Sequence, residues 1–266
     1  MTLVRRVGAE LEFAVSDPTS FMLGVAVARG VPVDIEALTI SIDGRFLEPA
    51  ELIDHHGSRL HVFDADPGTL RVSYAAQVTG RAPRADVDPV DLIRYLRPSR
   101  YVQSDRLVDL AREHFGGLAA PDAVAAVGEW VAGRLAYVPE ATSPTGGAFE
   151  TLETGAGVCR DFAHVTAALL RALDIPARLV SVYAPQLEPM DFHSVVEAHV
   201  EGRWYVVDAT RLAPRASLIR ISTGRDATDT AFETNTRADV ALLRLAVVAQ
   251  ADERFVDDPT EWVELG

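Results

Sequence analysis

The segment ETGAGVCRDFAHVTAALLRALDIP, residues 153–176, carries the only cysteine of the chain, Cys159, directly after a glycine-rich turn. Apolar residues recur at helical spacing from Phe162 to Leu173 and Pro176 ends the pattern, so a helix is predicted to begin near the cysteine. In the first turn of a helix, free N–H groups and the helix dipole lower the pKa of a thiol and favour the reactive thiolate. A cysteine can equally be a small buried hydrophobe, so position alone leaves a nucleophilic and a packing role open.

A second polar set lies in residues 191–210, DFHSVVEAHVEGRWYVVDAT. Glu201-Gly202 predicts a tight turn between two antiparallel strands. His193 lies eight residues before this turn and Asp208 six residues after it, so antiparallel pairing brings them to the same end of the hairpin. A carboxylate there can orient an imidazole that takes the proton of a thiol, which is the arrangement a cysteine nucleophile needs.

Three motifs, in this order, resemble those of the transglutaminase-like superfamily. Residues 157–164, GVCRDFAH, with residues 168–178 resemble the nucleophile helix, His193 with Glu197 resembles the histidine strand, and Asp208-Ala209-Thr210 resembles the terminal Asp-Pro-Thr motif. The resemblance implies that Cys159 is the nucleophile, His193 the base and Asp208 the residue that orients the base.

This resemblance extends over the chain, with an N-terminal β region like that of bacterial members, a junction at residues 95–101 and a segment at 223–227. Two departures are Val195, where the family commonly has an aromatic residue, and Ala209, which replaces the usual proline. Relatives include protein cross-linkers, peptidases, amidases and inactive members, so the resemblance is specific for the superfamily and not for one reaction.

The chain divides at a change of hydrophobic period. Short alternating segments between Val4 and Thr79, separated by turns, predict an N-terminal antiparallel β-sandwich domain over residues 1–85. The proline-rich and charged segment 80–89 suits a linker. Beyond it, helices followed by strands predict an α+β domain over residues 86–266, and the resemblance implies a papain-like, transglutaminase-like catalytic domain.

Individual elements of the second domain follow from capping and periodicity. Ser104 is predicted to cap a helix from Asp105 to about Phe115, and Pro121 to open a second helix. Strands are predicted at Ala177–Tyr183, Ser194–Val200, Trp204–Val207, Leu218–Ile221 and Leu242–Val248.

Composition excludes several classes of protein. Of the 266 residues, 48% are hydrophobic and 24% charged, as in folded globular chains. The net charge of −14 disfavours nucleic acid and anionic membranes as partners. No apolar run of about 18 residues is present, and the charges at Arg5, Arg6, Glu10 and Glu12 are unlike a signal peptide, so we expect a cytoplasmic protein. One cysteine can form neither an internal disulfide nor a multi-cysteine zinc site.

The remaining polar residues have structural alternatives. His193, Glu197 and His199 share one strand face and could hold a metal, but strands often carry alternating polar residues, so we expect neither metal nor cofactor. His164, five residues after the thiol, should project elsewhere and be structural, and Asp161 should complement the helix dipole. His55, His56 and His61 are expected to be solvent-exposed. An oxyanion site could use the Cys159 N–H with a second donor among Tyr137, Ser143 and Thr145.

These features predict a cysteine-dependent acyl-transfer enzyme that hydrolyses an amide or peptide bond through a thioester. Its expected partner is a peptide or protein substrate, and the sequence does not fix the oligomeric state. Two alternatives stay open, transamidation of glutamine side chains and a non-catalytic peptide-binding module.

Overall fold

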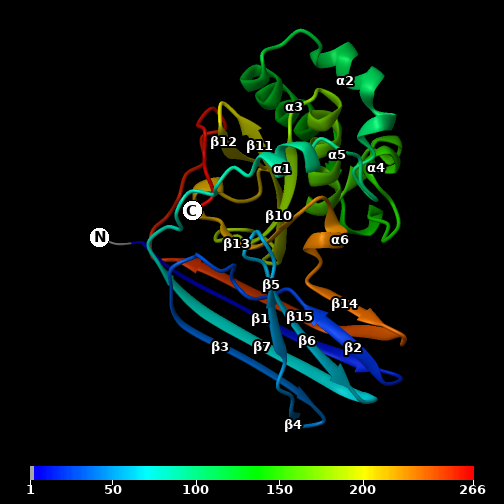
Figure 1. Ribbon diagram of the computed structural model, residues 1–266, viewed down its shortest axis with the longest axis vertical. Coiled ribbons are helices and arrows are strands. Elements are labelled where there is room, and N and C mark those ends of the chain that lie inside the picture. The colour runs from blue at the N-terminus through cyan, green and yellow to red at the C-terminus, as the bar shows by residue number, and fades with distance from the viewer. Residues whose placement is uncertain (1–2) are drawn as a thin grey trace.

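Two antiparallel sheets stack as a β-sandwich at the lower end of the molecule in Figure 1. The computed structural model describes residues 3–266. In the first sheet the order is β15-β1-β7-β3-β4, comprising β1 Val4–Val15, β3 Val33–Ile42, β4 Arg45–Phe46, β7 Gly68–Thr79 and β15 Val240–Ala251. In the second the order is β14-β2-β6-β5, comprising β2 Thr19–Leu23, β5 Ala50–Ile53, β6 Arg59–Ala65 and β14 Glu233–Thr236.

Alternating side chains fill the space between these sheets. On β1, Val7, Leu11 and Phe13 point inward and are buried. The ring of Phe21, on β2, lies 5.9 Å from that of Phe13 and 5.4 Å from that of Phe63. Burying a side chain of this size contributes about 1.5–3 kcal/mol. The predicted α+β class with an N-terminal β-sandwich is confirmed.

The sandwich also takes strands from the C-terminal part of the chain. β15 pairs with β1 from Arg5↔Ala251 to Val15↔Val240, and β14 pairs with β2. Without β15, the twelve residues of β1 would form an open sheet edge. The predicted strand Leu242–Val248 is therefore present but belongs to the sandwich, and the division into residues 1–85 and 86–266 does not account for residues 233–251. Residues 81–88 form no helix or strand and join β7 to the first helix.

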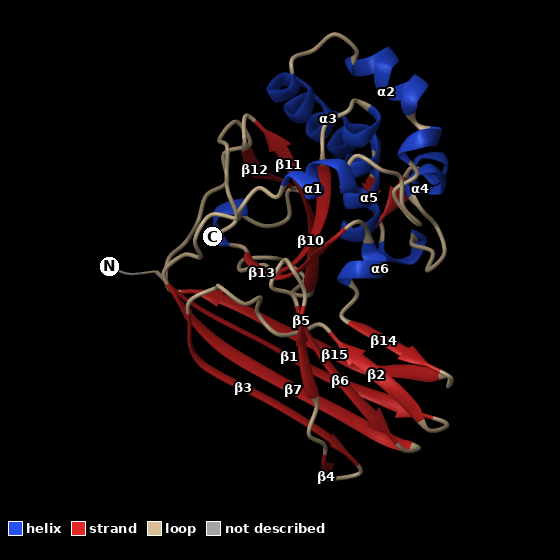
Figure 2. Ribbon diagram, in the orientation of Figure 1, coloured by secondary structure: helices blue, strands red, loops and turns tan. Residues whose placement is uncertain are grey.

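A third antiparallel sheet and the helices form the upper part of the molecule (Figure 2). Its order is β12-β11-β10-β13, comprising β10 Ala177–Tyr183, β11 Phe192–Val200, β12 Arg203–Val207 and β13 Ile219–Gly224. The helices are α1 Pro89–Arg94, α2 Val108–Phe115, α3 Ala120–Arg134, α4 Ala148–Thr154, α5 Cys159–Ala172 and α6 Ala227–Thr230. A two-stranded parallel ladder joins β8 Ala136–Tyr137 to β9 Ala156–Gly157, directly before α5.

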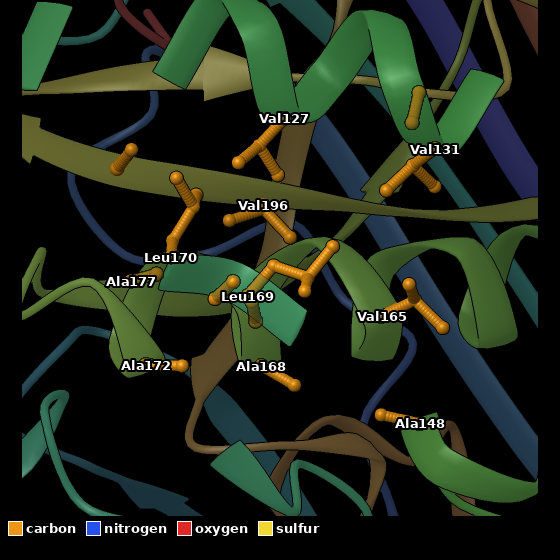
Figure 3. Close-up of a cluster of buried hydrophobic side chains, with 14 of the residues drawn as sticks. Val127, Val131, Ala148, Val165, Ala168, Leu169, Leu170, Ala172, Ala177 and Val196 are labelled. Atoms are coloured by element: carbon orange, nitrogen blue, oxygen red, sulfur yellow. The ribbon is translucent and has the colours of Figure 1, made fainter. Parts of the chain in front are cut away.

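Helix α5 lies at the centre of this part and is buried along almost its whole length. Figure 3 shows Val165, Leu169 and Leu170 of α5 on the side that faces Val196 of the sheet and Val127 and Val131 of α3. Val165 and Leu169 pack in one cluster with Val131 of α3 and Val196 of β11, and each of the four is fully buried. A helix held on all sides cannot shift easily in a close-packed core, so the position of Cys159 at its first residue is fixed.

The two parts of the molecule share apolar and polar contacts. Tyr183 of β10 lies in the hydrophobic cluster of the sandwich, and its hydroxyl donates to the carbonyl of Val25 at 2.8 Å. The buried guanidinium of Arg5, on β1, donates to the carbonyls of Leu218 at 3.1 Å and Gly80 at 2.6 Å. These contacts fix the sandwich against the β12-β11-β10-β13 sheet.

Some predicted helix boundaries differ from the structure. Ser104 begins a 3-10 turn that ends at Arg106, and α2 starts only at Val108, without a side-chain cap. Ser104 is buried, so it lies inside the fold and not at the exposed end of a helix. Within residues 3–266, no helix combines the length and the apolar character needed to cross a membrane.

Candidate active site

Cys159 is the first residue of α5, and the turn before it is held by Asp161. The Asp161 carboxylate accepts a hydrogen bond from the backbone N–H of Val158 at 3.0 Å. A Cβ atom on Gly157 would lie 2.6 Å from the Cβ of Asp161, so this position requires glycine. Asp161 also binds the guanidinium of Arg160 at 2.9 Å. Asp161 therefore shapes the start of the helix, as the sequence predicts.

The predicted hairpin between β11 and β12 is present, with Val200 opposite Arg203. At its far end, Nε2 of His193 lies 2.7 Å from Oδ2 of Asp208. The other carboxylate oxygen of Asp208 accepts from the backbone N–H of Thr210 at 3.0 Å and from its hydroxyl at 2.7 Å. Asp208 is thus held on both oxygens, and the imidazole has one fixed orientation.

Charge and burial act in opposite directions on this pair. Burial alone would lower the pKa of His193, but the charge and hydrogen bond of Asp208, with a hydrogen bond to Cys159, raise that pKa to about 10. Burial would raise the pKa of Asp208, and the His193 charge together with the Thr210 hydrogen bonds lowers it. Both shifts favour an imidazolium beside a carboxylate. The thiol of Cys159 lies beside this pair: it contributes to the raised pKa of His193, and its sulfur lies 4.0 Å from the carbonyl oxygen of Phe192, the residue before His193.

Tyr137 is the one candidate oxyanion donor with a contact to Cys159. The β8–β9 ladder places Tyr137 opposite Gly157, and its hydroxyl lies close enough to the backbone N–H of Cys159 for that group to act on its pKa. Burial, followed by the negative charges of Cys159 and Asp191, raises the pKa of Tyr137 to about 12, so its hydroxyl keeps its proton at neutral pH. Side-chain oxygens of Ser143 and Thr145 lie 3.4 Å from one another instead.

The architecture and these motifs have known counterparts. A family model described as the transglutaminase-like superfamily matches residues 109–209. The crystal structure of a candidate cysteine protease from Cytophaga hutchinsonii is 33% identical in sequence, with a TM-score of 0.88 over 99% of this chain and 97% of that one. The chain belongs to the transglutaminase-like superfamily.

Two further proteins are similar to this transglutaminase-like chain. The uncharacterized protein ML0607 of Mycobacterium leprae (strain TN) is 30% identical over an alignment of 179 residues that covers 62% of this chain and 61% of that protein. The periplasmic domain of TgpA from Pseudomonas aeruginosa is 21% identical, with a TM-score of 0.44 over 78% of this chain and 87% of that domain. Superfamily membership and the likeness to the Cytophaga protein support a cysteine-based enzyme.

In this transglutaminase-like domain, the strand face of His193 also carries Glu197, which two arginines hold. Glu197 binds Arg178 and Arg220 at 2.7 Å each. Burial would raise the pKa of Glu197, but the two guanidinium groups lower it to about 2. His199 packs edge-on against Trp204, with ring centroids 5.2 Å apart. Glu197 is therefore committed to a buried ion-pair network.

The burial of the other histidines agrees with the sequence analysis at some positions and differs from it at others. His164 is buried, accepts a hydrogen bond from the N–H of Ala227 at 3.2 Å and stacks on Tyr101, in agreement with a structural role. The expectation of solvent exposure is wrong for His56 and His61, whose side chains are only 9% and 6% exposed. His55 is exposed. The reason for the burial of His56 is that helix α1, six residues long, packs against its loop.

Proposed function

We propose that the protein is a cysteine-dependent acyl-transfer enzyme that hydrolyses amide or peptide bonds through a thioester on Cys159. The observation that carries this proposal is the buried, hydrogen-bonded pair of His193 and Asp208 beside the thiol of Cys159, which stands at the start of a buried helix. The nucleophile, a base within reach of it and a carboxylate that orients the base are the three groups that such chemistry requires.

In the first half of the reaction, the thiol proton resides on His193, as the raised pKa of this residue favours, and the thiolate sulfur of Cys159 attacks the carbonyl carbon of the substrate. The carbon–sulfur bond forms as the carbonyl electron pair moves to oxygen. His193 then donates the proton to the departing amine, and the carbon–nitrogen bond breaks to leave the thioester. Throughout, Asp208 stabilises the positive charge on the imidazole.

In the second half, His193 accepts a proton from water, whose oxygen attacks the thioester carbonyl. Collapse of this intermediate releases the carboxylic acid product and returns the proton to the sulfur. An amine in place of water would give transamidation by the same steps, so the acceptor alone distinguishes the two reactions. Lacking lysine, this chain could not cross-link itself through side-chain amines.

Tyr137 and the backbone N–H of Cys159 are suited to stabilise the negative oxygen of both tetrahedral intermediates. The two groups lie close together at the start of α5. A substrate oxyanion at this point would accept one hydrogen bond from each group. Because both donors keep their protons near neutral pH, this stabilisation is available throughout the neutral pH range.

The proposal is tested by incubating the protein with a peptide library and measuring new N-termini, released ammonia and incorporated amine. New N-termini or ammonia without amine incorporation are expected. Cys159→Ala is the control, since it removes the nucleophile and little volume. A peptide aldehyde probe separates the third alternative, because a non-catalytic peptide-binding module with an inert thiol would not form the thiohemiacetal. Dominant amine incorporation would identify a transamidase instead.

A further inference from the structure

Outside the candidate active site, a second cluster of polar side chains lies where the β-sandwich meets helix α1. His55 and His56 come from the loop between β5 and β6, and Asp91 from the first turn of α1. Their ligand-capable atoms all lie within 4.8 Å of one another. His55 Nε2 is 3.5 Å from Asp91 Oδ1, and His56 Nε2 is 3.5 Å from Asp91 Oδ2.

These two separations join different oxygens of Asp91, are too long for good hydrogen bonds, and are close to the spacing of neighbouring ligands around one metal ion. Zinc binds imidazole nitrogen and carboxylate oxygen at about 2.0–2.1 Å, which places neighbouring tetrahedral ligands about 3.4 Å apart. Two imidazoles and one carboxylate with an open fourth position form a donor set that suits this ion. We propose that His55, His56 and Asp91 bind a Zn²⁺ ion that joins the β-sandwich to helix α1, with water as the fourth ligand.

Both elements that supply the ligands are held in place by the fold. The Asp54 carboxylate accepts from the backbone N–H groups of His56 and Ser58, each at 2.8 Å, which fixes the histidine loop. The carbonyl of Gly57 accepts from the N–H of Arg29 at 2.8 Å. Asp91 is 2% exposed and lies in a helix capped by a carboxylate. Little ordering of the chain is therefore needed for the ion to bind.

A cavity of about 350 Å³ opens onto the same three residues and provides a path for the ion and space for its water ligand. The linker residues 82–86 form part of its wall, with Asp88. Arg178 and Arg220 also line it, and their charges are shared with the buried Glu197. Two further arginines of the lining, Arg29 and Arg84, are matched in number by Asp86 and Asp88.

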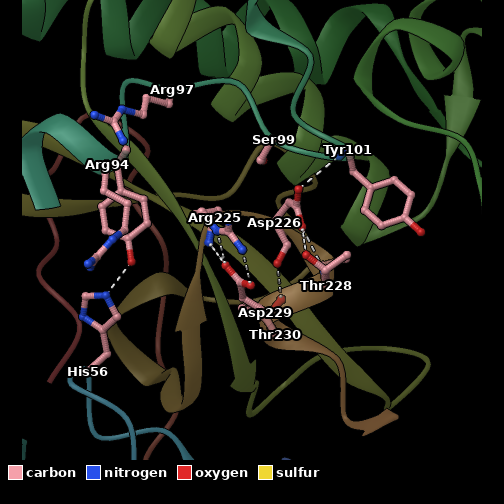
Figure 4. Close-up of polar contacts among 12 residues, drawn as sticks. His56, Arg94, Arg97, Ser99, Tyr101, Arg225, Asp226, Thr228, Asp229 and Thr230 are labelled. Carbon is pink, nitrogen blue, oxygen red and sulfur yellow. Dashed lines mark hydrogen bonds and ion pairs between the residues drawn. The ribbon is translucent and has the colours of Figure 1, made fainter. Parts of the chain in front are cut away.

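Two neighbouring side chains, Arg94 and Tyr95, hydrogen-bond to the proposed ligand atoms. A guanidinium nitrogen of Arg94 donates to both His55 Nε2 and Asp91 Oδ1. The hydroxyl of Tyr95 hydrogen-bonds to His56 Nε2, the dashed contact beside Arg94 in Figure 4. The Arg94 side chain is 35% exposed, so it can turn toward solvent when the ion replaces it. Arg94 is thus a competing cation at the same place.

The proposed site lies far from Cys159. The carbonyl of Tyr95 accepts from the N–H of Ala177, and Arg171 near the end of α5 donates to the carbonyl of Arg97 at 3.0 Å. Helix α1 therefore lies near the C-terminal end of α5, about 18 Å along the helix from the thiol. A metal ion there would stabilise the contact between the two parts and take no part in the bond-breaking step.

The test is a zinc titration of the full chain after chelator treatment and removal of the chelator, with a competing colorimetric indicator. One equivalent should bind to the wild type and to Cys159→Ala, and cobalt should give the intense visible bands of four-coordinate sites. His55→Ala and Asp91→Asn should each weaken binding on the order of a hundredfold. Arg94→Gln should tighten it, because the competing guanidinium is gone. His114→Ala, at an exposed histidine on α2, is the matched control.

Thermal denaturation supplies a second readout that does not depend on the indicator. Zinc should raise the melting temperature of the wild type and of His114→Ala, and leave that of Asp91→Asn unchanged. Circular dichroism spectra of the variants should match that of the wild type. Absence of one-to-one binding, wild-type affinity in both His55→Ala and Asp91→Asn, or loss of binding in Cys159→Ala would overturn the proposal. The last result would move the ion to the nucleophile.

Discussion

The Nε2 atom of His193 lies 2.7 Å from Oδ2 of Asp208, and both side chains are buried. This contact leaves the other ring nitrogen of His193 for the thiol side. Thr210 holds the second oxygen of Asp208, so the carboxylate cannot rotate away without losing two further hydrogen bonds. Thr210 therefore holds Asp208, and Asp208 holds His193 beside Cys159. Each of these residues can be tested by one substitution.

Replacement of Cys159 by alanine should abolish turnover and leave the fold intact. A first-turn residue at the helix end contributes little to the core, whereas loss of the nucleophile normally costs several orders of magnitude in rate. Peptide turnover measures the loss of activity, and circular dichroism measures the fold. Iodoacetamide labelling should be absent from the variant, because the chain has no second thiol. Residual turnover above about one hundredth of wild type would exclude the covalent mechanism.

Tyr137→Phe should lower kcat about 10²–10³-fold with a small change in KM, since the lost hydroxyl acts on the oxyanion and not on the bound substrate. Ser143→Ala is the matched control, because the Ser143 hydroxyl contacts only Thr145 among the described side chains. Steady-state kinetics on one peptide measure both variants. Equal rates for Tyr137→Phe and wild type would assign the second donor elsewhere.

The sequence predicts local features of the site better than its long-range contacts. The period of residues 153–176 predicts α5, and Glu201-Gly202 predicts the turn that aligns His193 with Asp208, because each pattern lies within one continuous segment. The catalytic roles themselves stay predictions. The sequence offers Tyr137 only as one of three candidate oxyanion donors. Its position near Cys159 depends on the β8–β9 ladder, whose strands are two residues long and give no periodic signal.

Pairing between distant segments accounts for the remaining differences. The apolar residues of 242–248 indicate a strand but carry no information about its partner, so its place beside β1 is visible only in the folded chain. For His56, burial results from the six-residue helix α1, which is too short to give a periodic signal. The sequence does not indicate the proposed zinc site, because the histidines and Asp91 lie on two elements about 35 residues apart.

Stability should depend on pH through the pair of His193 and Asp208. The pKa of His193 is raised to about 10, so its stabilising contribution is complete below its unfolded pKa of about 6.5 and is lost as the pH rises through 10. The pKa of Asp208 is lowered from 3.8, so its contribution is present above that value and is lost as the pH falls below it. Urea unfolding of wild type and His193→Gln measures the difference. The free-energy gap between them should shrink from pH 7 to pH 10, and a constant gap would mean that His193 is neutral in the fold.

Asp208→Asn should preserve the hairpin and lower the rate by roughly 10³–10⁴-fold, because an amide can favour the wrong tautomer of His193 and cannot stabilise its charge. The reactivity of Cys159 should change as well. The pH at which iodoacetamide alkylation reaches half its maximal rate reports the thiolate population, and this pH should rise in Asp208→Asn as the pair of thiolate and imidazolium weakens. Asp191→Asn is the control, since it removes a nearby carboxylate that does not contact the His193 ring nitrogens in the described structure. Wild-type turnover and an unchanged alkylation profile in Asp208→Asn would mean that this carboxylate only ends a strand, and that His193 is oriented by other contacts.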